Sequence, residues 1–257
     1  MGTVLARLKG VSVGYAGHTV LHDLDLDIVS GRQLAVLGAS GAGKSTLLKL
    51  LSRELTPLRG EFSSTGVREG VVGQDPDLFD WLTIRENIAL GLTFAANRGP
   101  TGESRVDQVI ELLGLSDVVD RYPDEVSGGQ AQRASLARAL AISPDLLLLD
   151  EPFSALDPAT RQELQQWLRA TADAGGLTSV LVTHDLDEAL VVADEIVLVD
   201  RQGRLTRTWL NEHPAADATQ ALVHPLRTQL RRAYTADAEA GDEEFSGFAA
   251  VGGGRRG

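Results

Sequence analysis

The sequence predicts an α/β fold, in which a parallel sheet is preceded by an antiparallel β-rich part and interrupted by helices. Two observations carry this prediction. Short aliphatic runs recur along the chain, and each is followed by a helical pattern. A long stretch from about 83 to 141 has helical patterns without such runs. The 257 residues suffice for one or two domains, and we expect one domain over 3–235.

The N-terminal part is expected to be antiparallel. Leu24-Asp25-Leu26-Asp27-Ile28 alternates apolar and acidic residues, which is the period of a strand with one buried face. After Gln33 the pattern changes to an aliphatic run over 34–37, a glycine-rich turn, and leucines at helical spacing over 44–51. Strand, glycine turn and helix in succession are typical of a parallel α/β sheet.

The same unit recurs downstream of the helical stretch. Aliphatic runs at 146–149 and 179–182 precede helical patterns over about 158–174 and 186–193, and a further run follows at 196–199. Beyond about residue 236 the chain becomes acidic and glycine-rich, so we expect a disordered tail over 236–257.

Composition excludes several classes of protein. The absence of cysteine excludes a disulfide scaffold, a cysteine-ligated metal site and a thiol nucleophile. The net charge of −12 argues against a broad basic surface for nucleic acid or anionic lipid. The longest apolar runs are far shorter than the roughly 20 residues of a transmembrane helix.

Residues 38–45 satisfy the pattern G-x-x-x-x-G-K-[ST] between a predicted strand and a predicted helix. Glycines let the backbone approach phosphates closely, amide groups at the helix N-terminus attract anions, and the lysine and serine reach the terminal phosphates and Mg²⁺. We therefore expect a nucleotide phosphate site made by Gly38, Ala39, Ser40, Gly41, Ala42, Gly43, Lys44, Ser45 and Thr46.

Two carboxylates, Asp150 and Glu151, follow the aliphatic run 146–149. Alone, such a pair is commonly a solvated turn. Because ligands bind at the carboxyl edge of parallel strands, the phosphate loop changes this interpretation. We expect Asp150 to hold the metal and Glu151 to act as the general base for an attacking water.

Ser127-Gly128-Gly129-Gln130 directly precedes another helical pattern. The simpler interpretation is a helix N-cap, with the serine accepting an amide hydrogen bond. The same features also make a second phosphate-binding helix start, which a single site with one phosphate loop does not require.

Taken in order, these motifs resemble those of the ATP-binding subunit of an ABC (ATP-binding cassette) transporter, a P-loop NTPase. The resemblance implies that Tyr15 stacks on adenine and that His184 is the switch histidine; Asp157 belongs to the D-loop and Gln74 to the Q-loop. It identifies 126–130 as the signature, with valine where leucine is usual. Core packing for Tyr15 and a helix cap for Asp157 remain alternatives.

The resemblance further implies catalytic roles for Glu151, His184 and Lys44, with Mg²⁺ held by Ser45, Gln74 and Asp150. In this family two copies of the cassette bind ATP head to tail, so that the signature of one copy completes the site on the other. The expected partners are a second copy, a membrane permease and, indirectly, an extracytoplasmic solute-binding protein, with no nucleic acid. The chain would lie on the cytoplasmic face, held through the permease.

A narrower similarity concerns 78–88, which resembles the corresponding segment of importers for nitrate, aliphatic sulfonates and taurine. Trp81 within it could instead be a core anchor of the helical insertion. The segment 74–94 would form the groove for a cytoplasmic helix of the permease. ABC ATPases acting on DNA or ribosomes are the main rivals; they carry long coiled coils or two cassettes, and the sequence has neither.

Overall fold

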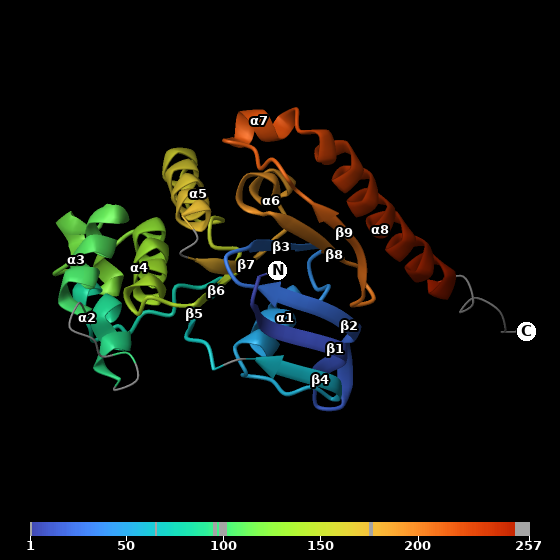
Figure 1. Cartoon of the computed structure of the whole chain (residues 1–257), viewed down its shortest axis with the longest axis horizontal. Coiled ribbons are helices and arrows are strands. Elements are labelled where there is room, and N and C mark those ends of the chain that lie inside the picture. The colour runs from blue at the N-terminus through green and yellow to red at the C-terminus, as the bar shows by residue number, and fades with distance from the viewer. Residues whose placement is uncertain (1, 65, 95–96, 98–101, 175–176, 250–257) are drawn as a thin grey trace, which may run out of the picture.

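A six-stranded sheet forms the centre of the computed structural model, which describes residues 2–64, 66–94, 97, 102–174 and 177–249 (Figure 1). Its strand order is β5-β6-β7-β3-β8-β9, and all neighbours are parallel except β8 and β9. The strands are β3 (Gln33–Gly38), β5 (Glu69–Val72), β6 (Leu146–Asp150), β7 (Thr178–Thr183), β8 (Glu195–Val199) and β9 (Leu205–Leu210). The predicted α/β fold is confirmed.

A second sheet of three antiparallel strands has the order β2-β1-β4. It consists of β1 (Val4–Tyr15), β2 (His18–Val29) and β4 (Arg59–Ser64). Leu24, Leu26 and Ile28 are buried while Asp25 and Asp27 are exposed, as the alternation predicts. The buried face covers helix α1 (Lys44–Leu51), which packs against strands of both sheets.

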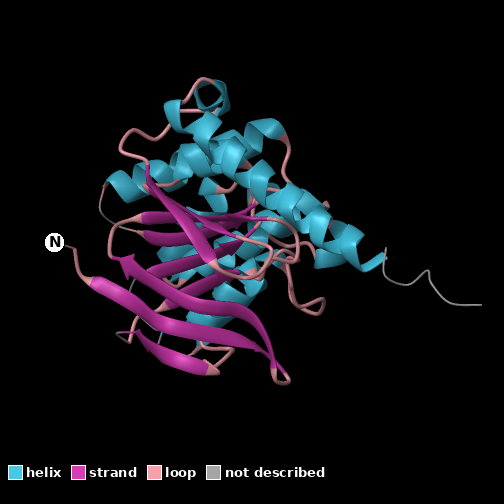
Figure 2. Cartoon of the chain, turned by 90° about the vertical axis from the view of Figure 1, so that its right-hand side faces the viewer, coloured by secondary structure: helices cyan, strands magenta, loops and turns pink. Residues whose placement is uncertain are grey.

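The opposite face of the central sheet is covered by helices (Figure 2). These are α5 (Pro158–Asp173) and α6 (Leu186–Val192), followed by α7 (Ala218–Leu222) and α8 (Pro225–Ala249). Strands β6 and β7 are aliphatic on both faces because each face packs against a hydrophobic cluster. This arrangement places the carboxyl ends of β3, β6 and β7 at one edge of the sheet.

The helical insertion lies at one end of the molecule, beyond β5 (Figure 1). Its elements fall within the predicted stretch 83–141: α2 (Ile84–Ala89), η1 (Leu90–Thr93), α3 (Gly102–Leu112), η3 (Ser116–Val118), η4 (Pro123–Glu125) and α4 (Gly128–Ala141). Thr83 begins α2 and Ser127 begins α4, each with a capping box in which side chain and backbone hydrogen-bond reciprocally.

The C-terminal part differs from the tail expected over 236–257. Helix α8 continues to Ala249, and residues 250–257 lie outside the described part of the chain. Residues 236–240 alternate alanine with aspartate and glutamate, and alanine is the strongest helix former. Within the described ranges, no helix combines the length and apolarity needed to cross a membrane.

Candidate functional site

The loop between β3 and α1 is shaped by its glycines. Gly43 has a φ of +96°, and a Cβ there would lie 2.7 Å from a methyl group of Leu21. Only glycine accepts both constraints without strain. The loop therefore wraps around the Lys44 side chain, whose Nζ donates to the carbonyl oxygens of Gly38 and Ala39 at 2.9 and 3.0 Å.

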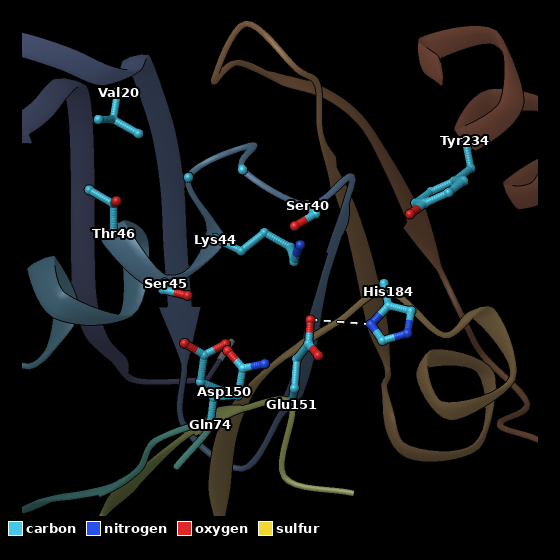
Figure 3. A pocket seen from close by; sticks show the side chains of 12 residues that line it. Val20, Ser40, Lys44, Ser45, Thr46, Gln74, Asp150, Glu151, His184 and Tyr234 are labelled. Carbon is cyan, nitrogen blue, oxygen red and sulfur yellow. Dashed lines mark ion pairs between the residues drawn. The ribbon is translucent and has the colours of Figure 1, made fainter. Parts of the chain in front are cut away.

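Two acidic residues stand at the end of β6, facing this loop (Figure 3). Glu151 has a φ of +47°, an unusual conformation for a residue with a side chain. Its amide donates to the carbonyl oxygen of Val182 on β7 at 2.9 Å, which ties the turn to the neighbouring strand. One carboxylate oxygen, Oε1, lies 3.2 Å from Nδ1 of His184, which follows β7.

These elements enclose a cavity of about 510 Å³. All of its lining residues except Val20 and Tyr234 were candidates from the sequence. The lining consists of Val20, Ser40, Gly41, Gly43, Lys44, Ser45, Thr46, Gln74, Asp150, Glu151, His184 and Tyr234. The structure thus brings together the phosphate loop, both carboxylates, the glutamine and the histidine from four separate parts of the chain.

Burial changes the acid–base properties of the site. It lowers the pKa of Lys44, and the carboxylates of Glu151 and Asp150 oppose this change. It raises the pKa of Asp150, against a hydrogen bond with the Ser45 side chain. Carboxylate, hydroxyl and amide oxygens of Asp150, Ser45 and Gln74 line the same cavity, and these are donors that Mg²⁺ prefers.

Three predicted site regions do not line this cavity. Tyr15, with 42% of its surface exposed, lies beside α1, where Nζ of Lys49 is 5.8 Å from its ring centroid. Asp157 is the N-cap of α5 and accepts hydrogen bonds from the amides of Ala159 and Thr160 at 3.1 Å, as the cap alternative predicts. Its D-loop role stays a prediction.

The third of these regions is the segment 127–130 at the start of α4. Ser127 accepts a hydrogen bond from the amide of Gln130 at 3.2 Å, so the N-cap interpretation is confirmed. A Cβ on Gly128 would meet no atom within 4 Å, whereas one on Gly129 would lie 3.3 Å from the carbonyl oxygen of Ala155. The phosphate-binding interpretation requires a ligand that reaches this helix start from outside the cavity.

Helix α4 also connects to the segment around Gln74. Gln132 donates to the carbonyl oxygen of Gly73 at 3.2 Å, and Arg138 donates to those of Asp77 and Pro76 at 2.7 and 3.1 Å. The helical insertion is thereby joined to one wall of the cavity.

Two aromatic side chains are presented nearby, on the loop before α2. Phe79 and Trp81 form an edge-on pair with ring centroids 5.1 Å apart, and Trp81 is 72% exposed. The alternative of Trp81 as a core anchor is therefore wrong. Buried Asn87 fixes this loop, because its side chain accepts from the Phe79 amide and donates to the carbonyl oxygens of Phe79 and Leu82.

The sequence did not indicate two lining residues. Val20 lies on β2, and a Cβ on Gly43 would meet its side chain at 2.9 Å, so its place follows only from the packing of the second sheet. Tyr234 lies on α8, some 50 residues beyond His184. The sequence signal for Tyr234 is its position on the apolar face of an amphipathic helical pattern.

Comparison with known proteins gives a consistent result. The family described as "ABC transporter" matches residues 21–154. A sulfate/thiosulfate import ATP-binding protein CysA of Thermosynechococcus vestitus is 40% identical over 241 residues, which cover 88% of this chain and 71% of that protein. The protein of the same name from Synechococcus elongatus is 44% identical over 234 residues, covering 86% and 68%.

Solved structures agree with these relatives. The dimeric structure of the ATP-binding cassette MJ0796 in a post-hydrolysis state, bound to ADP and Pi, matches with a TM-score of 0.74 and 29% identity. The match covers 81% of this chain and 99% of that one. A further chain, described as an ATP-binding subunit of an ABC transporter, matches with a TM-score of 0.71 and 27% identity.

Proposed function

This chain belongs to the ABC transporter family of ATP-binding proteins, and we propose that it energises the import of a small oxyanion through a membrane permease. Its activity is ATP hydrolysis coupled to transport. The observation that carries the proposal is the single cavity that holds the phosphate loop around Lys44 together with Glu151 and His184.

In the proposed mechanism, the loop amides and Lys44 stabilise negative charge on the transferring phosphoryl group. Lys44 is 7% exposed, and its ammonium group is already held by loop carbonyl oxygens, so little reorganisation is needed when phosphate enters. Glu151 accepts a proton from the attacking water. His184, 3.2 Å from that carboxylate, orients it and contacts the terminal phosphate.

The donors fit a magnesium ion. Ser45, Gln74 and Asp150 would hold it, and the half-buried Asp150 carboxylate, with its raised pKa, lacks a compensating cation at hydrogen-bond distance among the described residues. When bound, the ion supplies positive charge beside the phosphates.

A second copy completes the site in this proposal. Ser127 and Gly128 are exposed at the N-terminus of α4, where amides and the helix dipole favour an anion, yet they do not line the cavity of their own chain. Head-to-tail pairing brings this helix start over the ATP held by the partner. The dimeric cassettes among the solved relatives are consistent with such a pair.

The transported solute is proposed from the relatives. Those compared above are named for sulfate and thiosulfate import, and they do not confirm the narrower expectation of nitrate, sulfonates or taurine. We take sulfate or thiosulfate as the first candidate. The sulfonate-type solutes stay the second, because the segment around exposed Trp81 resembles the importers of that group.

We further propose that Phe79 and Trp81, held by Asn87, face the permease and that this contact keeps the chain at the cytoplasmic face of the membrane. A solute-binding protein would deliver the anion from the other side.

The test is reconstitution of the chain with the permease that co-purifies from native membranes and with its solute-binding protein. Sulfate or thiosulfate should stimulate ATP hydrolysis in these proteoliposomes, and Glu151→Gln should abolish the stimulation while ATP still binds. Stimulation by taurine or nitrate alone would move the assignment to the second candidate. An ATPase rate that no solute changes and no permease alters would contradict the transport role.

A further inference from the structure

Helix α8 reaches the nucleotide cavity from the C-terminal end of the chain. Figure 3 shows Tyr234 across the pocket from the Lys44 loop, with its hydroxyl turned toward the side on which Ser40 and His184 lie. The helix is drawn along the outer side of the β8–β9 layer in Figure 1. Among the described side chains of α8, Tyr234 lines the cavity.

The position of Tyr234 is fixed by the face of α8 on which it lies. Leu230 and Ala233 are 1% and 5% exposed and belong to the hydrophobic core, and Tyr234 packs partly against the same cluster. Together with Asp237 they follow the spacing i, i+3, i+4 and i+7, which defines one face of a helix. The apolar anchors therefore direct the tyrosine ring inward.

Two polar contacts hold α8 on either side of the ring. Near its start, Arg227 donates to Asp187 of α6 through Nε at 2.7 Å and through a terminal nitrogen at 3.2 Å. One turn after Tyr234, the Asp237 carboxylate accepts from the amide of Arg201 at 3.2 Å. Asp187 lies three residues after His184, so α8 is attached to the helix that follows the switch histidine.

The chemistry of this phenol suits a phosphate oxygen. Burial raises the pKa of Tyr234, and the carboxylates of Asp237 and Glu151 raise it further against Arg201, so the hydroxyl keeps its proton at neutral pH. A protonated phenol donates a hydrogen bond to an anion. The half-buried ring also forms part of the cavity wall.

We propose that Tyr234 is a further nucleotide-binding residue, whose hydroxyl donates to the terminal phosphate of ATP from the side opposite Lys44. The inference rests on the proposed ATP site and extends it to the C-terminal helix. It predicts a residue that distinguishes ATP from ADP, because ADP lacks the phosphate that the hydroxyl contacts. We also expect the contact between α8 and α6 to affect the affinity for ATP.

The test compares the affinities of ATP and ADP, measured by titration calorimetry on the full chain with Mg²⁺. Tyr234→Phe removes only the hydroxyl and should weaken ATP binding about tenfold, the usual effect of losing one hydrogen bond to a charged group. ADP affinity should stay within about twofold. Arg227→Ala, which detaches α8 from α6, should weaken ATP binding in the same direction and also spare ADP.

Arg232→Ala is the matched control, since Arg232 is exposed on the same helix and lies outside the cavity. It should leave both affinities unchanged. Unchanged ATP affinity in Tyr234→Phe, an equal loss for ATP and ADP, or faster hydrolysis in that variant would overturn the inference. A wild-type chain that binds neither nucleotide would instead contradict the ATP site itself, so the two failures are distinguishable.

Discussion

The two phosphate-type helix starts of this chain, at Lys44 and at Gly128, differ in what surrounds them. The first is enclosed by strands of both sheets and lines a cavity with carboxylates from β6 and a histidine after β7. The second is a capped, exposed helix start in the insertion, with open space above Gly128. The Lys44 site is lined by residues of this chain, whereas the helix start at Gly128 is open to solvent. The difference is the one expected if, as we propose, the chain carries parts of two separate ATP sites.

The largest effect is expected in the enclosed region. Glu151→Gln should slow ATP turnover at least about 100-fold, the usual contribution of a general base, while ATP affinity is kept. Steady-state hydrolysis and equilibrium ATP binding measure the two quantities. Near wild-type turnover would show that Glu151 is not the base.

A smaller effect on rate is expected from the exposed region. Gly128→Asp should fold normally, because a Cβ there meets nothing and an acidic residue is favourable in the first turn of a helix. It should nevertheless lower turnover at least about tenfold, since the added charge would face the phosphates of the partner's ATP. ATP affinity at concentrations where the chain is monomeric should not change. Equal turnover in wild type and variant would mean that this helix start takes no part in hydrolysis.

Buried Glu188 on α6, four residues after His184, predicts a pH dependence of stability. Burial raises the pKa of Glu188 to about 7, against a hydrogen bond from Thr183, whose Oγ1 lies 2.6 Å from Oε2. The folded chain binds this proton more tightly than the unfolded chain, whose carboxyl titrates near 4.5. The free energy of unfolding should therefore fall by about 1 kcal/mol from pH 6 to pH 8 because of this group.

Urea denaturation of Glu188→Gln isolates this contribution, because glutamine keeps the acceptor for Thr183 and cannot ionise. The variant should lose less stability than the wild type between pH 6 and pH 8. Identical pH dependence in both proteins would mean that Glu188 titrates in the ordinary range.

The smallest expected effects distinguish a residue that only caps a helix from one that also takes part in ATP hydrolysis. Ser127→Ala and Thr83→Ala each remove a capping box, and each should lower the free energy of unfolding by about 1 kcal/mol. Only Ser127→Ala should also slow ATP hydrolysis by the isolated chain, because Thr83 caps α2 and belongs to neither helix start. If both variants slowed hydrolysis equally, the role of Ser127 would be structural alone.

The enclosed region could be predicted from the sequence because its signals are local. Strand, phosphate loop and helix follow one another within 33–51, and both carboxylates stand at the end of one buried strand, β6. The edge at which they meet follows from the rule for parallel sheets. The two roles predicted for Asp157 differ in the same way: its cap depends only on the next three residues, whereas a D-loop role depends on a partner.

The remaining features of the fold and the site depend on contacts between residues that are distant in sequence. Tyr234 enters the cavity because Leu230 and Ala233 seat α8 on the core, and a single amphipathic pattern does not say which surface it meets. Strand β9 pairs antiparallel with β8. Its residues do not alternate between buried and exposed, so the sequence lacks the periodic pattern that predicts a strand. The helix over 236–249 differs from the tail expected there, because the helix propensity of alanine outweighs the acidic composition.

We propose above all that the segment 127–130 of one chain completes the ATP site of another. Since the chain has no cysteine, one cysteine can be placed at Ser40→Cys in one preparation and at Gly128→Cys in a second, differently tagged one. Each preparation also carries Glu151→Gln, so that bound ATP is not hydrolysed.

The measurement is disulfide formation between the two tags on mixing. We expect a crosslinked heterodimer that forms with ATP and Mg²⁺ and not without nucleotide. A mixture that gives no crosslink with ATP, or the same crosslink without it, would contradict the claim.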